Sequence, residues 1–403
     1  MIKKIIHWDA LLKLFPFLHN VSGILRNARL LSPFRIDQAV EAQHEVGRSV
    51  ENLQILWPAQ EKVPLDPTEN ERKFLKICKY FNDGFYSRAN IFVCEVPQAY
   101  CHVGTGLVCT RDFKAITDSN LEYRRLSTNL HFKWFKPLCT QRLPSGDYHY
   151  ATIADVWTFN WHHWLVDCLS RLHSLSQAYP GRRIVLLTPA GLKQDWKDSL
   201  AAALPPHFEI KYLPYNSWVQ VDRLLLPSFV SARANYHLPP GYYDALRKTT
   251  FERLGLPAEA EPRERLYISR ANATRRRILN EADLVELLGR YGFRSVISEK
   301  MAFKDQVDLF RRAEIVAGPY GANWGDNLYA GKIKNLVFYA DRPPETHVFT
   351  FSKGLGQEHF FLTGGKDHVD ADFTVDLADV ERVLQDEMHL QPSVSTGLKS
   401  TSV

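Results

Sequence analysis

The sequence predicts an α/β protein with two doubly wound units and a helical N-terminal extension. Short apolar segments of strand character alternate with longer segments of helical periodicity along most of the 403 residues. The alternation begins twice, and a segment rich in proline and glycine separates the two series. This alternation is typical of parallel sheets covered by helices, and the chain is long enough for two such cores.

The first 65 residues are expected to form the helical extension. Residues 1–31 are basic, and their apolar side chains recur at helical spacing. Asp9, Lys13 and Pro16 interrupt the apolar segments, and no clean cleavage site follows, which argues against a secretory signal. We favour a helix docked on the protein's own core over an interfacial helix that rests on a membrane.

Residues 66–240 contain the first strand–helix series. Two short strands, at 91–96 and 106–110, precede a helical segment at about 161–178. Strand, helix, strand and strand are then predicted at 182–188, 191–204, 208–214 and 222–228. This order predicts a first α/β domain.

Residues 241–390 contain the second series and predict a second α/β domain. Asn280 and Gly292 are the expected caps of its first helix. The order is that of a doubly wound, nucleotide-binding sheet, whose ligands bind at the carboxyl ends of the strands. Residues 391–403 lack apolar periodicity and are expected to be disordered. The predicted strands are 265–270, 293–298, 314–322 and 335–340, and the predicted helices are 280–292 and 303–313.

Charge and composition narrow the class of ligand. The net charge of +5 suits an anionic small ligand or an anionic membrane surface, and it is too dispersed for nucleic acid. The six cysteines form no CxxC pair, which is typical of reduced thiols in the cytoplasm. No apolar run approaches the roughly 20 residues of a membrane span. We therefore expect a cytoplasmic protein whose membrane contact, if any, is peripheral and made through residues 1–31.

A first candidate site lies on the helix predicted after Asn160. His163 and Asp167 are four residues apart and share a helix face with Arg171. A buried carboxylate beside an imidazole can have a pKa suited to taking a proton from a hydroxyl group. The alternative is a structural His–Asp pair. A metal site made of His162, His163 and Cys168 is disfavoured, because adjacent histidines point in different directions.

A second candidate site follows the strand 265–270. Ser269 and Arg270 end this strand, Arg275, Arg276 and Arg277 follow in a short loop, and a helix begins near Asn280. Arginine forks pair bidentately with phosphate oxygens, and a helix N-terminus favours anions. The loop therefore predicts a diphosphate clamp, and the alternative is a solvated arginine run.

A third candidate site is the turn after the strand 314–322. Gly318, Tyr320, Gly321 and Ala322 let backbone N–H groups approach an anion closely, although many α/β turns look similar. The pair Asp370 and Asp372 has the spacing of a metal-binding motif. It lies instead among alternating strand residues, so no bound metal is expected.

In this order and spacing, the three sites resemble glycosyltransferase family 61, which includes bacterial capsular-polysaccharide enzymes. The resemblance runs from about Glu95 to Ala340, and the segment 95–119 is similar to the bacterial branch. The pattern N-x-x-H-W-x-x-D is matched by Asn160, His163, Trp164 and Asp167. The later segments are matched by residues 266–270, Arg276, Arg277, Leu279, Asn280, Glu281, Glu299, Phe303, Gln306 and Phe310.

The resemblance implies a GT-B architecture, in which two Rossmann-like domains face a cleft. Residues 66–240 would bind the acceptor and residues 241–390 the donor. The implied reaction is inverting and metal-independent: a sugar moves from a nucleotide-diphosphate donor, a UDP-sugar in our expectation, to a hydroxyl of a glycan or polysaccharide. No cofactor is expected, and the implied role is capsule or cell-surface polysaccharide synthesis.

The resemblance also assigns roles to residues. Asp167 would be the catalytic base, with His163 orienting it or the acceptor. Asn160, Trp164 and Arg171 would support these two residues. The donor diphosphate and nucleotide would be held by Ser269, Arg270, Arg276, Arg277, Asn280, Glu299, Gly318, Tyr320, Gly321 and Ala322.

The turn departs from the family pattern G-P-H-G-A-G-L-T-N. Tyr320 replaces its histidine, Asn323 a glycine and Asp326 its asparagine. Tyrosine can donate a hydrogen bond to a phosphate but carries no positive charge, and Asp326 adds negative charge. A catalytically silent scaffold subunit of a polysaccharide-synthesis complex is therefore the alternative function. A different nucleotide enzyme would need a P-loop or a G-x-G-x-x-G, and the sequence has neither.

Overall fold

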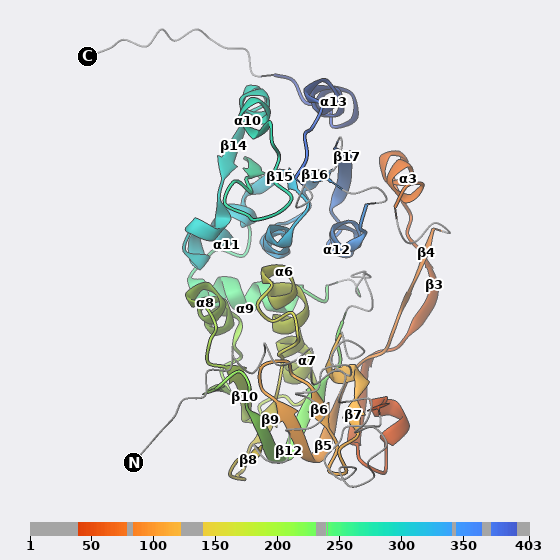
Figure 1. The fold of residues 1–403 in the computed structure, drawn as a ribbon, viewed down its shortest axis with the longest axis vertical. Helices are drawn as coiled ribbons and strands as arrows, with labels where there is room; N and C mark the ends of the chain where they lie inside the picture. The colour runs from red at the N-terminus through yellow and green to blue at the C-terminus, as the bar shows by residue number, and fades with distance from the viewer. Residues whose placement is uncertain are drawn as a thin grey trace, which may run out of the picture.

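Two β-sheets, one from each half of the chain, organise the computed structural model (Figure 1), which describes residues 39–78, 84–121, 140–230, 239, 241–340, 344–364 and 372–392. The N-terminal sheet lies in the lower part of Figure 1 and the C-terminal sheet in the upper part. Between them lie the helices α6 (Trp161–His163), α8 (Gln194–Ala203) and α9 (Asp244–Leu254). The predicted mixed α/β class is confirmed.

The C-terminal sheet is doubly wound. Among the described residues, five parallel strands follow the order β14-β13-β15-β16-β17. Their bounds are Glu264–Ile268 (β13), Phe293–Val296 (β14), Ala313–Pro319 (β15), Lys334–Tyr339 (β16) and Glu358–Thr363 (β17). The chain passes from β13 to β14 on one side and then crosses to β15 on the other. Ligands of such sheets bind where the order reverses, beyond the carboxyl ends of the strands.

The helical segments of this half fill the crossovers between its strands. Gly292 follows the first of them with a φ of 79°, the left-handed conformation in which a helix end favours glycine, as predicted. The segments are α10 (Glu281–Arg290), α11 (Phe303–Arg311), the 3-10 helix η6 (Ala322–Tyr329), α12 (His347–Gly354) and the terminal α13 (Leu377–Arg382).

The N-terminal sheet is mixed rather than doubly wound throughout. In the described part of this half, its order is β1-β7-β6-β5-β12-β9-β10-β11, with β2 beside β5 and β8 beside β12. Strands β12, β9, β10 and β11 are parallel, whereas β5 is antiparallel to β12, β2 and β6. The strands are Ala39–Val40 (β1), Glu51–Trp57 (β2), Ile91–His102 (β5), Val108–Cys109 (β6), Ala115–Ile116 (β7), Thr140–Arg142 (β8), His149–Ala151 (β9), Ile184–Pro189 (β10), Phe208–Leu213 (β11) and Trp218–Pro227 (β12).

The short turn between β5 and β6 explains the antiparallel portion, since a tight turn returns the chain beside itself and a parallel pair needs a long crossover. Helices α7 (Arg171–Ala178) and α8 supply such crossovers for β9, β10 and β11. Only this portion therefore has the predicted doubly wound character.

The predicted helical extension is wrong for residues 39–65. This stretch contains β1, β2, a third strand β3 (Gln60–Pro64) and a four-residue 3-10 turn. Strand β2 pairs with β5, and this pairing satisfies backbone N–H and C=O groups of residues 51–57. A tertiary contact of this kind overrides local helical periodicity. Residues 1–31, expected to form a docked helix with membrane contact as the alternative, and residues 393–403 of the predicted disordered tail lie outside the described residues.

Helix α3 (Glu69–Leu75) belongs by packing to the C-terminal half, although the predicted boundary placed residues 66–75 in the N-terminal domain. A capping box between Thr68 and Glu71 begins the helix. Phe74 packs against Phe349 of α12 and Phe361 of β17, each with ring centroids 5.1 Å apart. Glu71, fully buried, also pairs with Lys353 of α12 at 2.9 Å. The strands β3 and β4 (Phe85–Arg88) pair as a two-stranded arm that leads to and from α3 (Figure 1).

The two halves meet where α6 packs against η6. The Trp161 indole nitrogen donates to Asp326 Oδ1 at 2.7 Å. Gly325 lies against the backbone of α6, and a Cβ there would be 2.9 Å from His162 Cα. This close approach brings the predicted first and third sites together. In the described residues, we find no helix with the length and apolar character that crossing a bilayer would require.

Candidate active site

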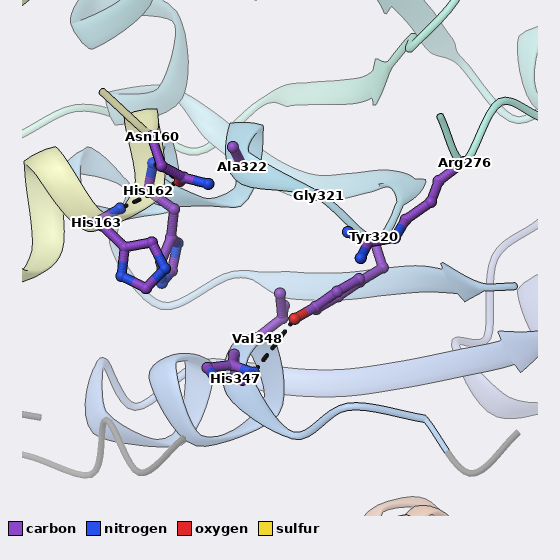
Figure 2. Close-up of a pocket in the computed structure, with 9 residues that line it drawn as sticks. All are labelled: Asn160, His162, His163, Arg276, Tyr320, Gly321, Ala322, His347 and Val348. Atoms are coloured by element: carbon purple, nitrogen blue, oxygen red, sulfur yellow. Dashed lines mark hydrogen bonds between the residues drawn. The ribbon is translucent and has the colours of Figure 1, made fainter. Parts of the chain in front are cut away.

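A pocket opens beside the contact between α6 and the carboxyl end of β15 (Figure 2). It holds about 430 Å³ of empty space, counting its open mouth, which lies within the usual size of small-ligand sites. Both halves of the chain contribute to it. The lining residues are Asn160, His162, His163, Arg276, Tyr320, Gly321, Ala322, His347 and Val348.

Asn160 fixes the start of α6 and so the direction of its two histidines. Its side-chain oxygen accepts from the backbone N–H groups of His162 at 3.1 Å and His163 at 3.5 Å. This is the N-cap bonding that stabilises a first helical turn. Trp164, the next residue, is buried and donates to Ser199 on α8 at 2.8 Å. Asn160 therefore lines the pocket, whereas Trp164 anchors the helix from behind.

His163 and Asp167 form the predicted pair. His163 Nδ1 lies 2.7 Å from Asp167 Oδ2, and their side chains are 20% and 0% exposed. Asp167 belongs to a π-helical segment, η4 (Trp164–Leu169), and such segments are frequent at functional sites. An ionised carboxylate only accepts, so the neutral imidazole donates from Nδ1 and keeps Nε2 as its basic nitrogen. Of the two side chains, His163 lines the pocket and Asp167 lies behind it.

The residues around His163 and Asp167 mainly hold the helix and its neighbours in place. Trp157 stacks on the His163 ring with centroids 5.7 Å apart. Arg171 is fully buried, but its hydrogen bonds go to the carbonyl oxygens of Pro227 and Ala154 rather than into the pocket. Burial lowers the pKa of Arg171 to about 10. Arg171 therefore ties α7 to the end of β12, and it supports the site only indirectly.

The C-terminal wall of the pocket carries a cation held over an aromatic ring. The Arg276 guanidinium carbon lies 5.0 Å from the centre of the Tyr320 ring. Arg276 has a φ of 57°, a left-handed conformation that costs free energy in a residue with a side chain. Tyr320 in turn stacks on Tyr339, with ring centroids 5.4 Å apart. A strained arginine at the pocket wall is the pattern of a residue held in place for a ligand.

Arg270 lies directly behind this wall. It donates to Asn323 Oδ1 at 3.4 Å and to the Arg275 carbonyl at 3.2 Å. A Cβ at position 321 would be 2.2 Å from Arg270 Nη1, so only glycine leaves room for the guanidinium. Burial lowers the pKa of Arg270, nearby Arg276 lowers it further, and Glu299 opposes them. Two like charges this close favour an anion between or beside them.

Several residues of the predicted clamp do not reach the pocket. Arg277 donates to Asp372 from its side chain at 2.6 Å and 2.9 Å and from its backbone at 2.8 Å. Asn280 stands at the expected N-cap, but its side chain exchanges hydrogen bonds with the backbone of Val375 instead of capping α10. The segment after residue 371 thus engages both side chains. Asp372, half of the rejected metal motif, is the partner of an arginine, and Asp370 lies outside the described residues.

Three further predicted residues support the turns around the pocket. The Ser269 hydroxyl accepts from the Ala271 backbone, and Ser269 is buried. Gly318 lets β15 approach β13, since a Cβ there would be 2.9 Å from the Ile268 carbonyl oxygen. Glu299 is exposed on a short 3-10 helix, Ser298–Lys300, and its charge raises the pKa of Arg270.

The pocket also has lining residues that sequence reasoning missed. His162, considered from the sequence as a member of the disfavoured metal site, lines the pocket although it is nearly buried. Burial holds the pKa of His162 well below its ordinary value, so this imidazole is neutral. His347 and Val348 begin α12, and no motif marks them in the sequence. His162 could have been predicted from its position beside His163, because Asn160 caps the helical turn that carries both residues.

In the described part of the chain, no three or more His, Cys, Asp or Glu side chains are grouped so that they could hold a metal ion. Cys168, one member of the disfavoured metal set, is buried, and burial raises the pKa of its thiol well above the ordinary value. His162 and His163 face the pocket from neighbouring positions, with their rings nearly perpendicular at 88°.

A proton-accepting dyad faces a positively charged turn at the reversal point of a doubly wound sheet, and these are the parts that a group-transfer enzyme needs. Comparison with known families indicates the class, which is that of the glycosyltransferases. The Glycosyltransferase 61 family model matches residues 161–329, and this region is similar to glycosyltransferase family 61. The matched region contains His163, Asp167 and Arg276, whereas Asn160 and His347 lie outside it. No curated protein sequence matches the chain.

Proposed function

We propose that the protein transfers a sugar from a nucleotide-diphosphate donor to a hydroxyl of a glycan or polysaccharide, with inversion and without a bound metal. One observation carries the proposal: a single pocket is lined by His163, backed by Asp167, and by Arg276 and the turn at Tyr320 and Gly321. The first pair can accept a proton, and the second group can hold a diphosphate at the position where doubly wound sheets bind nucleotides.

In the proposed reaction, His163 Nε2 removes the proton from the acceptor hydroxyl. The acceptor oxygen bonds to the anomeric carbon, and the bond from that carbon to the diphosphate oxygen breaks. Arg276, with Arg270 behind it, stabilises the negative charge of the leaving diphosphate. This division reverses the predicted roles of His163 and Asp167, because Asp167 is fully buried behind the imidazole. Asp167 then fixes the tautomer and orientation of His163.

The proposal extends to the wider setting of the reaction. We propose a GT-B type of enzyme, in which the N-terminal half binds the acceptor and the C-terminal half binds the donor, with UDP-sugars as the first candidates. The proposed role is synthesis of capsular or other cell-surface polysaccharide at the cytoplasmic face of the membrane. The family match and the basic balance of the chain support this setting.

A donor panel tests the function directly. Purified protein is incubated with UDP-, GDP- and CMP-sugars with and without a glycan acceptor, and released nucleotide is measured. We expect one nucleotide-diphosphate sugar to be consumed, at a rate that EDTA leaves unchanged because the cationic side chains neutralise the leaving group. NMR of the product should show an inverted anomeric configuration. Nucleotide binding without turnover would instead support the scaffold alternative, and loss of activity in EDTA would contradict the metal-free mechanism.

Removing the Arg276 guanidinium should weaken diphosphate binding. We expect Arg276→Gly to lower UDP affinity about 10-fold to 100-fold, the usual range for a lost charge-assisted hydrogen bond. Glycine tolerates the left-handed backbone at this position, so the substitution removes the charge without adding strain. Isothermal titration calorimetry measures the change. Arg275→Gly is the matched control, because Arg275 is the exposed neighbour and its side chain does not line the pocket. Equal losses in both variants would contradict a specific clamp.

A further inference from the structure

His347 presents an imidazole to the pocket from the first residue of α12 (Figure 2). Its ring lies on the C-terminal side of the pocket with Tyr320 and Arg276, and across from His162 and His163 of α6. The side chain is 29% exposed, so part of it is open to a ligand. This imidazole has no place in the reaction described above.

The contacts of His347 orient its ring. Tyr320 Oη lies 3.3 Å from Nδ1, and Glu345 Oε2 lies 3.8 Å from the same nitrogen. Both contacts are on the Nδ1 edge, and Nε2 is on the opposite edge of the ring. When the Tyr320 hydroxyl donates to Nδ1, the ring proton resides on Nε2, which becomes a donor. The Tyr320 ring is itself fixed between Tyr339 and the Arg276 guanidinium.

The helix that carries His347 is firmly anchored. Phe349 is fully buried and packs against Phe74 of α3. Ser352 accepts from Asn335 of β16 at 3.1 Å, and Lys353 pairs with the buried Glu71 at 2.9 Å. An imidazole on such a helix is held in position before a ligand arrives, which reduces the ordering cost of binding.

We propose that His347 is a donor-binding residue whose Nε2 donates to the diphosphate of the nucleotide sugar, with Tyr320 as its positioning residue. The proposal rests on the proposed function. A diphosphate offers acceptor oxygens on two phosphorus atoms, so it can be held by Arg276 on one side and by His347 on the other. Tyr320 contacts both residues and sets the spacing between them.

Binding measurements test this assignment. Calorimetry compares UDP, GDP, inorganic pyrophosphate and uridine as ligands of the full-length wild type, His347→Ala, His347→Gln and Tyr320→Phe. We expect His347→Ala to weaken binding of the preferred diphosphate about 10-fold or more and to leave uridine binding unchanged. The glutamine variant keeps an N–H donor and should recover part of the loss. Tyr320→Phe keeps the ring but not the hydroxyl, so its loss should be smaller.

Three further variants sharpen the test. The exchange Tyr320→His with His347→Tyr places the imidazole at the other end of the same hydrogen bond. It should bind diphosphate more tightly than His347→Tyr alone. His44→Ala is the control, because His44 has a 76% exposed side chain and lies outside the pocket. It should bind like the wild type.

The outcomes separate this proposal from the proposed function. Wild-type affinity for diphosphates in both His347→Ala and His347→Gln would overturn the His347 assignment alone. Equal weakening of uridine and UDP would also overturn it, because it would show a role in shaping the pocket. Binding of pyrophosphate but of no nucleotide would contradict the proposed donor and retain the assignment. Failure of the wild type to bind UDP, GDP and pyrophosphate would overturn both. If His347→Ala does not fold, the comparison rests on His347→Gln.

Discussion

Replacing Asp167 by asparagine is expected to lower kcat about 1,000-fold to 10,000-fold, the loss expected when a base loses its orienting carboxylate. Asp167 accepts the Nδ1 proton of His163 over 2.7 Å. An asparagine amide can donate to Nδ1 instead, which moves the ring proton to Nε2 and removes the base. UDP affinity should stay unchanged, because Asp167 does not line the pocket. Steady-state kinetics and calorimetry with the preferred donor measure the two quantities.

A companion variant distinguishes which of the two residues takes the proton. His163→Ala leaves a space beside an intact Asp167, and added imidazole should restore part of its activity if the ring nitrogen is the base. If Asp167 acted directly, imidazole would have no effect and His163→Ala would keep more activity than Asp167→Asn. Circular dichroism and the melting temperature confirm that each variant is folded. More than a tenth of wild-type kcat in Asp167→Asn would refute the dyad.

Replacing Asp326 by asparagine is expected to change the pH dependence of stability. Asp326 is 1% exposed and accepts from Trp161, and burial raises the pKa of its carboxyl to about 7. The unfolded chain has a pKa near 3.9 at an aspartate. Between these values the folded state holds a proton that the unfolded state has lost, so the free energy of unfolding falls as pH rises. The loss begins above about pH 4 and is complete above about pH 7.

Asparagine does not ionise and can still accept the Trp161 hydrogen bond through its carbonyl oxygen. Relative to wild type, Asp326→Asn should therefore gain about 3–4 kcal/mol between pH 4 and pH 8, since one pKa unit corresponds to about 1.4 kcal/mol. Denaturant unfolding of both proteins across this range measures the difference. Asp379→Asn, at a 57% exposed side chain, should show little change and serves as the control. A difference between Asp326→Asn and wild type that does not vary with pH would contradict the buried-carboxyl explanation.

The structure also explains Asp326, which stands where the family turn pattern has an asparagine. From the sequence, a negative charge was expected near an anionic ligand. The structure directs Asp326 to Trp161 of the other half, and its raised pKa reduces the charge that it carries at neutral pH. The aspartate at position 326 therefore affects the contact between the two halves more directly than it affects the charge of the pocket.

Strands β13, β14, β15 and β16 and helices α10 and α11 were predictable because their information is local: the two periodicities alternate within short segments of sequence. Helix α12 and strand β17 were not predicted. The N-terminal sheet depends on a distant pairing, since β5 pairs with β12 in a register that runs from Val93 opposite Pro227 to His102 opposite Trp218. No short-range pattern predicts such a pair, and a second distant pairing, of β2 with β5, made the expected helix at 51–57 a strand.

The site shows the same division between local and distant information. His163 and Asp167 are four residues apart, so their pairing was predictable from helix geometry. Arg277 and Asn280 were assigned to the clamp from their position in a basic loop. The chain returns beside that loop near Phe373, which pairs with Ile278, and this contact engages both side chains. His347 reaches the pocket from a different crossover, so its proximity to Tyr320 could not be read from the sequence.

The docking of α3 has a mechanical consequence. The chain leaves the N-terminal half along β3, touches the C-terminal half through α3, and returns along β4, so the two halves share more than the single connection that precedes α9. A hinge with one connection can swing widely, whereas a paired ribbon fastened at both ends resists rotation in the manner of a strut. We therefore expect the two halves to rotate little relative to each other when a ligand enters or leaves the pocket between α6 and α12.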